Sequence, residues 1–372
     1  MKRVCICWEL TSPYKLKWYW PSEGYKKPSF DIYFESNTDN HDFVNNILKL
    51  NEIIKNSINS GAKYTFNISG PCLEQIVANK ELLKSFKDIK NTNCVEFAAS
   101  PYYQSVSFMF HDKSEFISQI EKHVNLIKNT FHQNPKTLIN TQLFISDEIT
   151  KLGEELGFKC MIGEGSHNIL QKDDPTYLYK NHIPLLLRHI NLSEDIEKRF
   201  TNHTWSGYPL IADKFTAWID SIEGDIITLY LDYDSIIKHL NQSDLIIKFI
   251  EELPKSLAKA GIEMVNPLDV TTRCKTYPLS SLKKEMTARY GVNSLVGNHV
   301  QHIYMHELEH TLYQINKTDN KGYQDLHRCF QQNSIFLDMN STNYPLAYEN
   351  AVNLFSIFSD FKRGLIIGEK DK

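Results

Sequence analysis

The sequence lacks the long apolar runs, the signal segment and the basic excess that mark several protein classes. None of its 372 residues lie in a stretch long and apolar enough to cross a membrane, and the short apolar run before Glu9 is too short for a secretory signal. A formal net charge of -4 implies no basic face for nucleic acid or an acidic membrane. These absences predict a cytoplasmic protein whose partner is neither a membrane nor a nucleic acid.

A regular cysteine framework is also missing, which argues against a fold held by disulfides. The chain has seven cysteines, an odd number, scattered without a repeated spacing. In a chain of this length they are expected to be reduced thiols, as in a cytosolic protein. Cys5 and Cys7 alternate on one strand-like stretch and most simply fill the core.

Strand-like and helix-like stretches alternate over the first 270 residues. Apolar, β-branched runs predict strands, and apolar spacing of three and four predicts helices between them. The expected strands are Arg3–Trp8, Tyr64–Ile68, Cys94–Ala98, Lys136–Ile139, Lys159–Ile162 and Asp225–Leu231, and the longest expected helices are Asp42–Ile58, Glu115–Phe131 and Ser243–Ala260. Roughly seven such units predict an α/β fold, an incomplete (β/α)7 TIM-like barrel.

Beyond Ser280 the pattern becomes almost entirely helical. Apolar residues recur at spacings of three and four over Leu295–Leu312 and Ala347–Phe361, which predicts a C-terminal α-helical bundle. We therefore expect two domains, a barrel over residues 1–270 and a helical domain over residues 271–372.

Two of the predicted strands end in polar residues that could carry chemistry. Asn140, Thr141 and Gln142 follow one strand, and Asp232 and Asp234 follow another about ninety residues later. Barrel folds place their active sites at the C-terminal ends of the strands. An amide and carboxylates should therefore meet at that face.

These two stretches resemble glycoside hydrolase family 57, within it the α-amylase-like branch. That family has Arg-Asn-Thr-Glu-Leu at the first stretch, where this chain has Ile139-Asn140-Thr141-Gln142-Leu143, and it has Asp-Tyr-Glu-Thr-Phe-Gly-Glu-His at the second, where this chain has Asp232 through His239. The resemblance implies that Gln142 stands at the nucleophile position. It also implies that Asp232 keeps the position of the acid/base.

Further motifs of the same family follow in order along most of the chain, with several ionisable groups replaced. Thr11 stands where the family has the His of His-Gln-Pro, Ser100 and Gln104 replace a Glu and a His, and Ser334 and Ile335 replace an Asp and a His. The residues that the resemblance places on the substrate side are Thr11, Glu74, Tyr103, Glu164, Trp205, Asp234 and His239.

The replacement of the nucleophile governs the expected function. A retaining glycosidase needs two carboxyl groups, and a neutral amide neither attacks the sugar carbon nor stabilises a cationic transition state. The leading hypothesis is a protein that binds an α-1,4-glucan or maltooligosaccharide, with hydrolysis lost or greatly weakened. One alternative is an active hydrolase or 4-α-glucanotransferase in which Glu74, Asp234 or Glu164 replaces the nucleophile. The other is a protein-interaction scaffold.

Two further features carry weaker signals. His306-Glu307-Leu308-Glu309-His310 fits the zinc-hydrolase pattern, but the charge at Glu309 and the absence of a continuation argue against it, so neither a metal nor a cofactor is expected. A crowded set of aromatic residues could form a sugar platform or equally an anchor for core and loops: Trp8, Tyr14, Trp18, Tyr19 and Trp20.

Overall fold

The computed structural model describes residues 1–20, 27–35, 41–170, 174–317, 320–340 and 344–370. The chain forms two compact units that interleave along the sequence. The barrel unit comprises Met1–Thr11, Asn40–Ser100 and Ile120–Arg289, and the helical unit comprises Ser12–Asp39, Pro101–Gln119 and Tyr290–Lys372. The domain boundary expected at residue 270 stays a prediction.

Seven parallel strands close the barrel unit into a ring. Each pairs with its neighbours in parallel register, except that β3 and β4 join through Ala99, whose N–H donates to the Thr137 carbonyl and whose carbonyl accepts from the Ile139 N–H. In order around the ring they are β1 (Arg3–Leu10), β2 (Tyr64–Ile68), β3 (Val95–Phe97), β4 (Thr137–Ile139), β5 (Cys160–Glu164), β7 (Pro184–Arg188) and β8 (Ile226–Asp232). The predicted incomplete (β/α)7 TIM-like barrel is confirmed.

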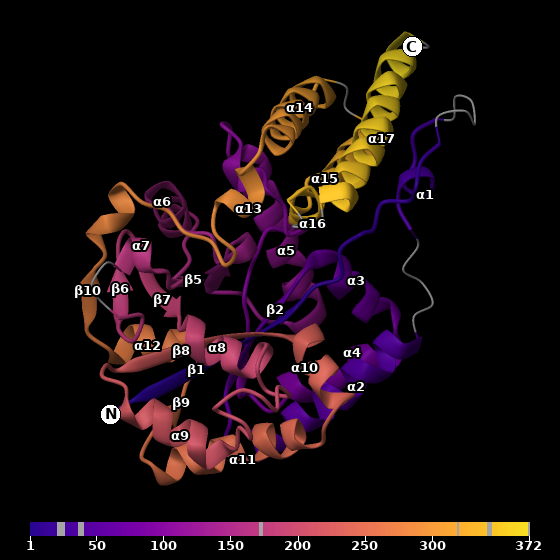
Figure 1. Cartoon of the computed structure of the whole chain (residues 1–372). Coiled ribbons are helices and arrows are strands. Elements are labelled where there is room, and N and C mark those ends of the chain that lie inside the picture. The colour runs from indigo at the N-terminus through magenta and orange to yellow at the C-terminus, as the bar shows by residue number, and fades with distance from the viewer. Residues whose placement is uncertain (21–26, 36–40, 171–173, 318–319, 341–343, 371–372) are drawn as a thin grey trace. The chain divides into compact units, whose positions relative to one another are not determined.

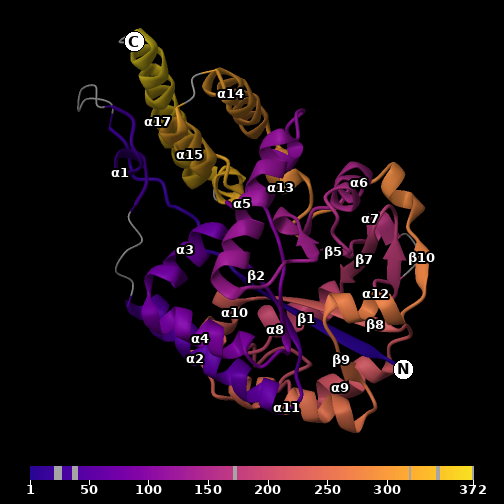
Figure 2. The same ribbon diagram turned by 180° about the vertical axis from the view of Figure 1, so that it is seen from behind.

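Helices follow the strands and cover the outside of the ring. α2, α4 and α11 lie side by side there (Figures 1 and 2). The helices of this unit are α2 (His41–Asn59), α3 (Gly70–Ala78), α4 (Lys80–Lys90), α6 (Asp147–Glu155), α7 (His167–Leu170), α8 (Ile190–Glu197), α9 (Ala212–Ser221), α10 (Tyr233–Leu240), α11 (Leu245–Lys259) and α12 (Pro267–Arg273), with most of α5 (Ser114–Phe131). Short strands β6 (Leu178–Lys180), β9 (Glu263–Met264) and β10 (Thr276–Pro278) extend the sheet.

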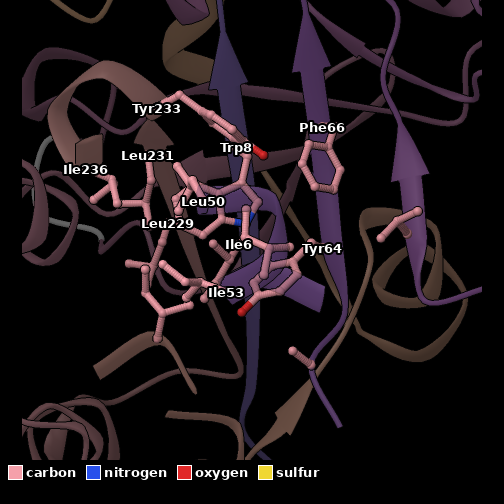
Figure 3. Packing of buried hydrophobic residues seen from close by; sticks show 14 of the residues in the cluster. Ile6, Trp8, Leu50, Ile53, Tyr64, Phe66, Leu229, Leu231, Tyr233 and Ile236 are labelled. Atoms are coloured by element: carbon pink, nitrogen blue, oxygen red, sulfur yellow. The ribbon is translucent and has the colours of Figure 1, made fainter. Parts of the chain in front are cut away.

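The pleat of the strands separates two hydrophobic clusters. Successive side chains of a strand point to opposite faces, so residues of one parity meet the helices and residues of the other meet the barrel interior. On β1, Val4, Ile6 and Trp8 belong to the cluster beneath the helices, whereas Cys5 and Cys7 belong to the interior cluster. Figure 3 shows the first cluster, with side chains of β1, β2 and β8 packed on those of α2 and α10.

Most of the predicted strands and helices occur where the sequence pattern places them. The strand Tyr64–Ile68 matches β2 and the helix Asp42–Ile58 matches α2 within a residue. The helix expected from about Ser243 to Ala260 occurs as α11, Leu245–Lys259. A further helix that was not predicted, α10, precedes it and begins at Tyr233 directly after β8, because Asp232 caps it.

Helices make up most of the helical unit. They are α1 (Phe30–Tyr33), α13 (Asn293–Val296), α14 (His299–Ile315), α15 (Lys321–Phe330), α16 (Asn333–Asp338) and α17 (Tyr344–Lys370). An aromatic core joins α15 to α17, where the ring of Phe330 lies 5.4 Å from that of Phe358 and 5.3 Å from that of Phe361. This matches the predicted C-terminal helical region. Among the described residues, no helix combines the length and apolar character needed to cross a membrane.

Candidate functional site

On each strand, alternate side chains point into the barrel, and the last of these at the C-terminal rim are polar. Cys5 and Cys7 line the interior, so Glu9 at the end of β1 follows the same face. Ile162 on β5 leads in the same way to Glu164, and Tyr230 on β8 leads to Asp232. In register, Glu9 lies beside Asp232. The barrel therefore brings carboxylates from separate strands to one edge.

A buried chain of ion pairs holds these acids. Arg289 bridges two of them, with Nη1 2.6 Å from Oε2 of Glu9 and Nη2 2.6 Å from Oε1 of Glu197. Arg188 continues the chain, with Nη2 2.9 Å from Oε2 of Glu197 and Nη1 3.3 Å from Oε1 of Glu164. The Arg188, Glu164 and Glu197 side chains are at most 2% exposed. Because buried charges are costly unless paired, the two guanidinium groups make this arrangement of three carboxylates tolerable.

Removal from water raises the pKa of two carboxyl groups in this set of ion pairs, those of Glu9 and Glu164. Burial raises the pKa of Glu9, and the neighbouring Arg289 guanidinium opposes that rise. Burial likewise raises the pKa of Glu164, opposed mainly by Arg188. Glu9 also accepts a hydrogen bond from the Tyr230 hydroxyl at 2.9 Å, and that hydroxyl accepts from the Asn67 amide at 2.7 Å.

Asp232, at the predicted acid/base position, is the N-cap of α10. Its side chain accepts hydrogen bonds from the backbone N–H of Ser235 at 3.1 Å and from the Ser235 hydroxyl at 2.8 Å. Its own backbone N–H donates to Oε1 of Glu197 at 2.8 Å. The cap explains why the helix starts here, since a carboxylate satisfies N–H groups that the first turn leaves open. The Asp232 side chain is half-buried and thus still reaches solvent.

Gln142, at the predicted nucleophile position, lies in the short turn Thr141–Leu143 after β4. Both Gln142 and Leu143 have positive φ, 53° and 55°, which side-chain-bearing residues rarely adopt and which is often found at functional sites. The backbone carbonyl of Gln142 accepts a hydrogen bond from the backbone N–H of Arg289 at 2.7 Å. Arg289 binds Glu197, and Glu197 binds the Asp232 N–H. Two residues ninety positions apart are thus held by one arginine–glutamate pair.

Two other predicted site residues, His239 and Glu164, contact members of this set of ion pairs. The Nε2 atom of buried His239 donates to the Glu197 carbonyl at 2.9 Å, and its Nδ1 accepts from the Thr201 hydroxyl at 3.0 Å. Burial lowers the pKa of His239, which favours the neutral imidazole. His239 thus fixes the backbone of Glu197, whereas Glu164 shares the Arg188 guanidinium with it.

The remaining predicted residues lie in different surroundings. Glu74 and Asp234 are exposed in α3 and α10, and Thr11 is half-buried just beyond β1. Trp205 is half-buried and meets Trp218 edge-on with 5.9 Å between ring centroids, packed against the helix-facing cluster. Tyr103 is a buried residue of the helical unit.

The aromatic set at the N-terminus divides between the two units. Trp8 is 1% exposed in the barrel core, so it belongs to no sugar platform. Tyr14, Trp18, Tyr19 and Trp20 fall in the helical unit.

Sequence reasoning missed Glu9, Glu197, Arg188 and Arg289 as members of a site. The interior parity of β1 pointed to Glu9, but nothing in the sequence indicated its partner, Arg289, 280 residues away.

The described residues contain no group of three or more His, Cys, Asp or Glu side chains placed to hold a metal ion. In the zinc-like motif, Glu307 pairs with Lys362 and Glu309 accepts the His111 N–H at 2.6 Å.

Comparison with known proteins decides the family. The model of glycosyl hydrolase family 57 matches residues 6–283. The chain belongs to glycosyl hydrolase family 57. A protein of Methanocaldococcus jannaschii provisionally named an α-amylase is 33% identical to this family 57 chain over 269 residues, which are 70% of this chain and 57% of that protein. The chain thus spans little more than half the length of that relative.

Solved structures agree on the fold of this family 57 protein. The 4-α-glucanotransferase of Thermococcus litoralis has a TM-score of 0.71 at 11% identity, covering 98% of this chain and 60% of that one. A family 57 branching enzyme of Thermococcus kodakaraensis, solved with glucose, has a TM-score of 0.67 at 10% identity, covering 97% of this chain and 90% of that one. At these identities the likeness establishes the fold alone.

Proposed function

We propose that this family 57 protein binds an α-1,4-glucan or maltooligosaccharide at the barrel rim and hydrolyses it weakly or not at all. The observation that carries the proposal is the shared attachment of Gln142 and Asp232 to Arg289 and Glu197. These contacts run through backbone atoms of Gln142 and Asp232, and they support a site in which the ends of β4 and β8 are tied to the same ion pair. The named activities of the relatives, α-amylase, 4-α-glucanotransferase and branching enzyme, support an α-glucan as the ligand. A cytoplasmic location is part of the proposal.

The chemistry follows from the charge of these two groups. Gln142 can donate and accept hydrogen bonds to sugar hydroxyls but carries no negative charge to attack the anomeric carbon. By analogy with nucleophile removal in proteases, turnover should fall on the order of 10⁶-fold. Asp232 keeps an acceptor near the site, yet protonating a leaving oxygen achieves little without the nucleophile.

The alternative of an active enzyme with another nucleophile is weaker for Glu164 than for the exposed acids. Glu164 is 1% exposed and Arg188 donates to both of its oxygens, so its carboxylate is turned to the protein. Glu74 and Asp234 are exposed. Partial desolvation by neighbouring atoms and the nearby Asp232 charge raise the pKa of Asp234, which favours a proton donor over a nucleophile. A scaffold without a sugar site is the remaining alternative.

The decisive experiment measures binding and turnover of maltoheptaose by wild type, Gln142→Glu and Asp232→Asn. We expect binding by all three and turnover only in Gln142→Glu. Turnover by wild type that Asp232→Asn abolishes would establish an active enzyme instead. Absence of binding in every variant would favour the scaffold.

A further inference from the structure

Exposed aromatic side chains are confined to the helical unit. Among the described residues, those left open to solvent are Trp18, Trp20, Tyr290, Tyr313, Tyr344 and Tyr348, and all six belong to that unit. Tyr348 is 71% exposed and Trp18 is 64% exposed. Single exposed rings are common on protein surfaces, so only those that line a hollow indicate a binding site. Of these six residues, Tyr348 lines a pocket.

An open pocket of about 690 Å³ lies beside Tyr348 in the helical unit. Three aromatic side chains line it, Tyr19, Tyr348 and Phe355, and all of its lining residues belong to the helical unit. Most come from one face of α17, where the spacing of Tyr348, Val352, Phe355 and Ser359 by three and four residues keeps them on one side. The volume falls within the roughly 300–1,000 Å³ typical of small-ligand sites.

One end of the pocket is charged. The Asp360 carboxylate accepts a hydrogen bond from the Tyr33 hydroxyl at 2.8 Å and also pairs with the Arg363 guanidinium. Asp360 is 7% exposed, whereas the Arg363 side chain is 50% exposed, so the guanidinium faces solvent at the pocket. Ser359 adds a hydroxyl beside them. Aromatic faces and hydrogen-bonding groups thus stand next to each other.

We propose that this pocket is a second binding site for an α-glucan chain, distinct in its residues from the barrel rim. The choice of ligand rests on the proposed function, since it assumes a protein that handles α-glucans. Sugar rings have apolar faces that stack on aromatic rings and hydroxyl edges that need donors and acceptors. Tyr19, Tyr348 and Phe355 supply the first, and Ser359, Arg363 and the tyrosine hydroxyls supply the second. A purely apolar ligand would offer no hydrogen-bond partner to the Asp360–Arg363 pair.

The test combines calorimetric titration of the full chain with maltoheptaose and hydrogen exchange with and without the sugar. We expect protection of residues 348–363 by maltoheptaose, and about tenfold weaker binding at this site in Tyr348→Ala. Tyr348→Trp should restore the affinity, because it returns a ring. Tyr313→Ala is the matched control, since Tyr313 is 63% exposed on α14 and does not line the pocket.

The barrel variant Asp232→Ala separates this site from the proposed function. In one outcome, maltoheptaose protects residues 348–363 in both wild type and Asp232→Ala but protects no strand end in wild type. This outcome would support glucan binding in the pocket and contradict glucan binding at the barrel rim. Protection at the strand ends alone, with Tyr348→Ala binding as wild type does, would overturn the pocket and leave the proposed function intact. Self-association in ultracentrifugation that Tyr348→Ala abolishes, without sugar protection on α17, would also overturn it and assign the surface to a second copy.

Discussion

The barrel unit and the helical unit differ in where they place charged and aromatic side chains. The barrel unit buries charged groups, with Glu164 and Arg188 each 1% exposed at its rim, and keeps rings such as Trp8 in its core. The helical unit also has an aromatic core, yet it alone leaves aromatic rings open to solvent among the described residues. The difference teaches that the two units meet different demands. The barrel must hold its charges in fixed positions, and the helices present a surface.

The largest expected effect tests the contrast between a buried and an exposed tryptophan. Replacing Trp8 by Ala removes a fully buried ring that meets Tyr64 and Tyr233, each at 5.7 Å between centroids, and should lower the free energy of unfolding by about 3–5 kcal/mol. Trp18→Ala should change it by no more than about 0.5 kcal/mol, because that ring is 64% exposed. Urea denaturation measures both. Equal losses would abolish the distinction between the two units.

The next effect tests whether the buried ion pairs of the barrel depend on one another. Arg289→Met leaves Glu9 and Glu197 without their shared partner and should cost about 3 kcal/mol or more in urea denaturation. The control is Arg273→Met, which breaks a surface pair with Glu263 and should leave the midpoint of urea denaturation nearly unchanged. A loss of control size for Arg289→Met would mean that water already screens the rim.

A third test uses the buried carboxyl group of Glu96, inside the barrel below the rim. Burial raises its pKa from 4.5 to about 7, opposed by a hydrogen bond from the Thr137 hydroxyl. A carboxyl with a raised folded-state pKa stabilises the protein below pH 4.5, and this contribution is lost as pH rises through about 7. Relative to wild type, Glu96→Gln should therefore gain up to roughly 3 kcal/mol between pH 4.5 and pH 8.

Unfolding measured at several pH values checks this gain. Thr137→Val, which removes the opposing hydrogen bond, should move the loss of stability to higher pH. A pH-independent difference between Glu96→Gln and wild type would show that water reaches this carboxyl group.

The smallest effect separates the structural role of Asp232 from a chemical one. Asp232→Ala removes the cap of α10 and should cost about 1 kcal/mol, whereas Asp232→Asn keeps a side-chain oxygen and should cost less. Both variants should lack any residual hydrolysis if Asp232 supplies the proton. An Asn variant that unfolds as readily as the Ala variant would show that the negative charge, and not the acceptor, holds the helix.

Much of the fold could be predicted from the sequence because strand and helix periodicities are local. The runs that became β1, β2 and β8 are apolar over several consecutive residues, which identifies a strand without knowledge of distant contacts. The start of α10 was missed because the strand passes into the helix at Asp232 without an intervening loop. The positive φ at Gln142 could not be predicted, because the turn contains no glycine, the residue that usually indicates this conformation.

The sequence by itself determined the alternation of strands and helices, the helical C-terminal region and the family to which the chain belongs. These follow from short-range patterns and ordered motifs, which need no knowledge of distant contacts. Only the tertiary structure decided that Glu9, Glu164, Glu197, Arg188 and Arg289 form one chain of ion pairs. The physical reason is that a buried charge requires a partner, and closing the barrel, not spacing along the chain, chooses which one.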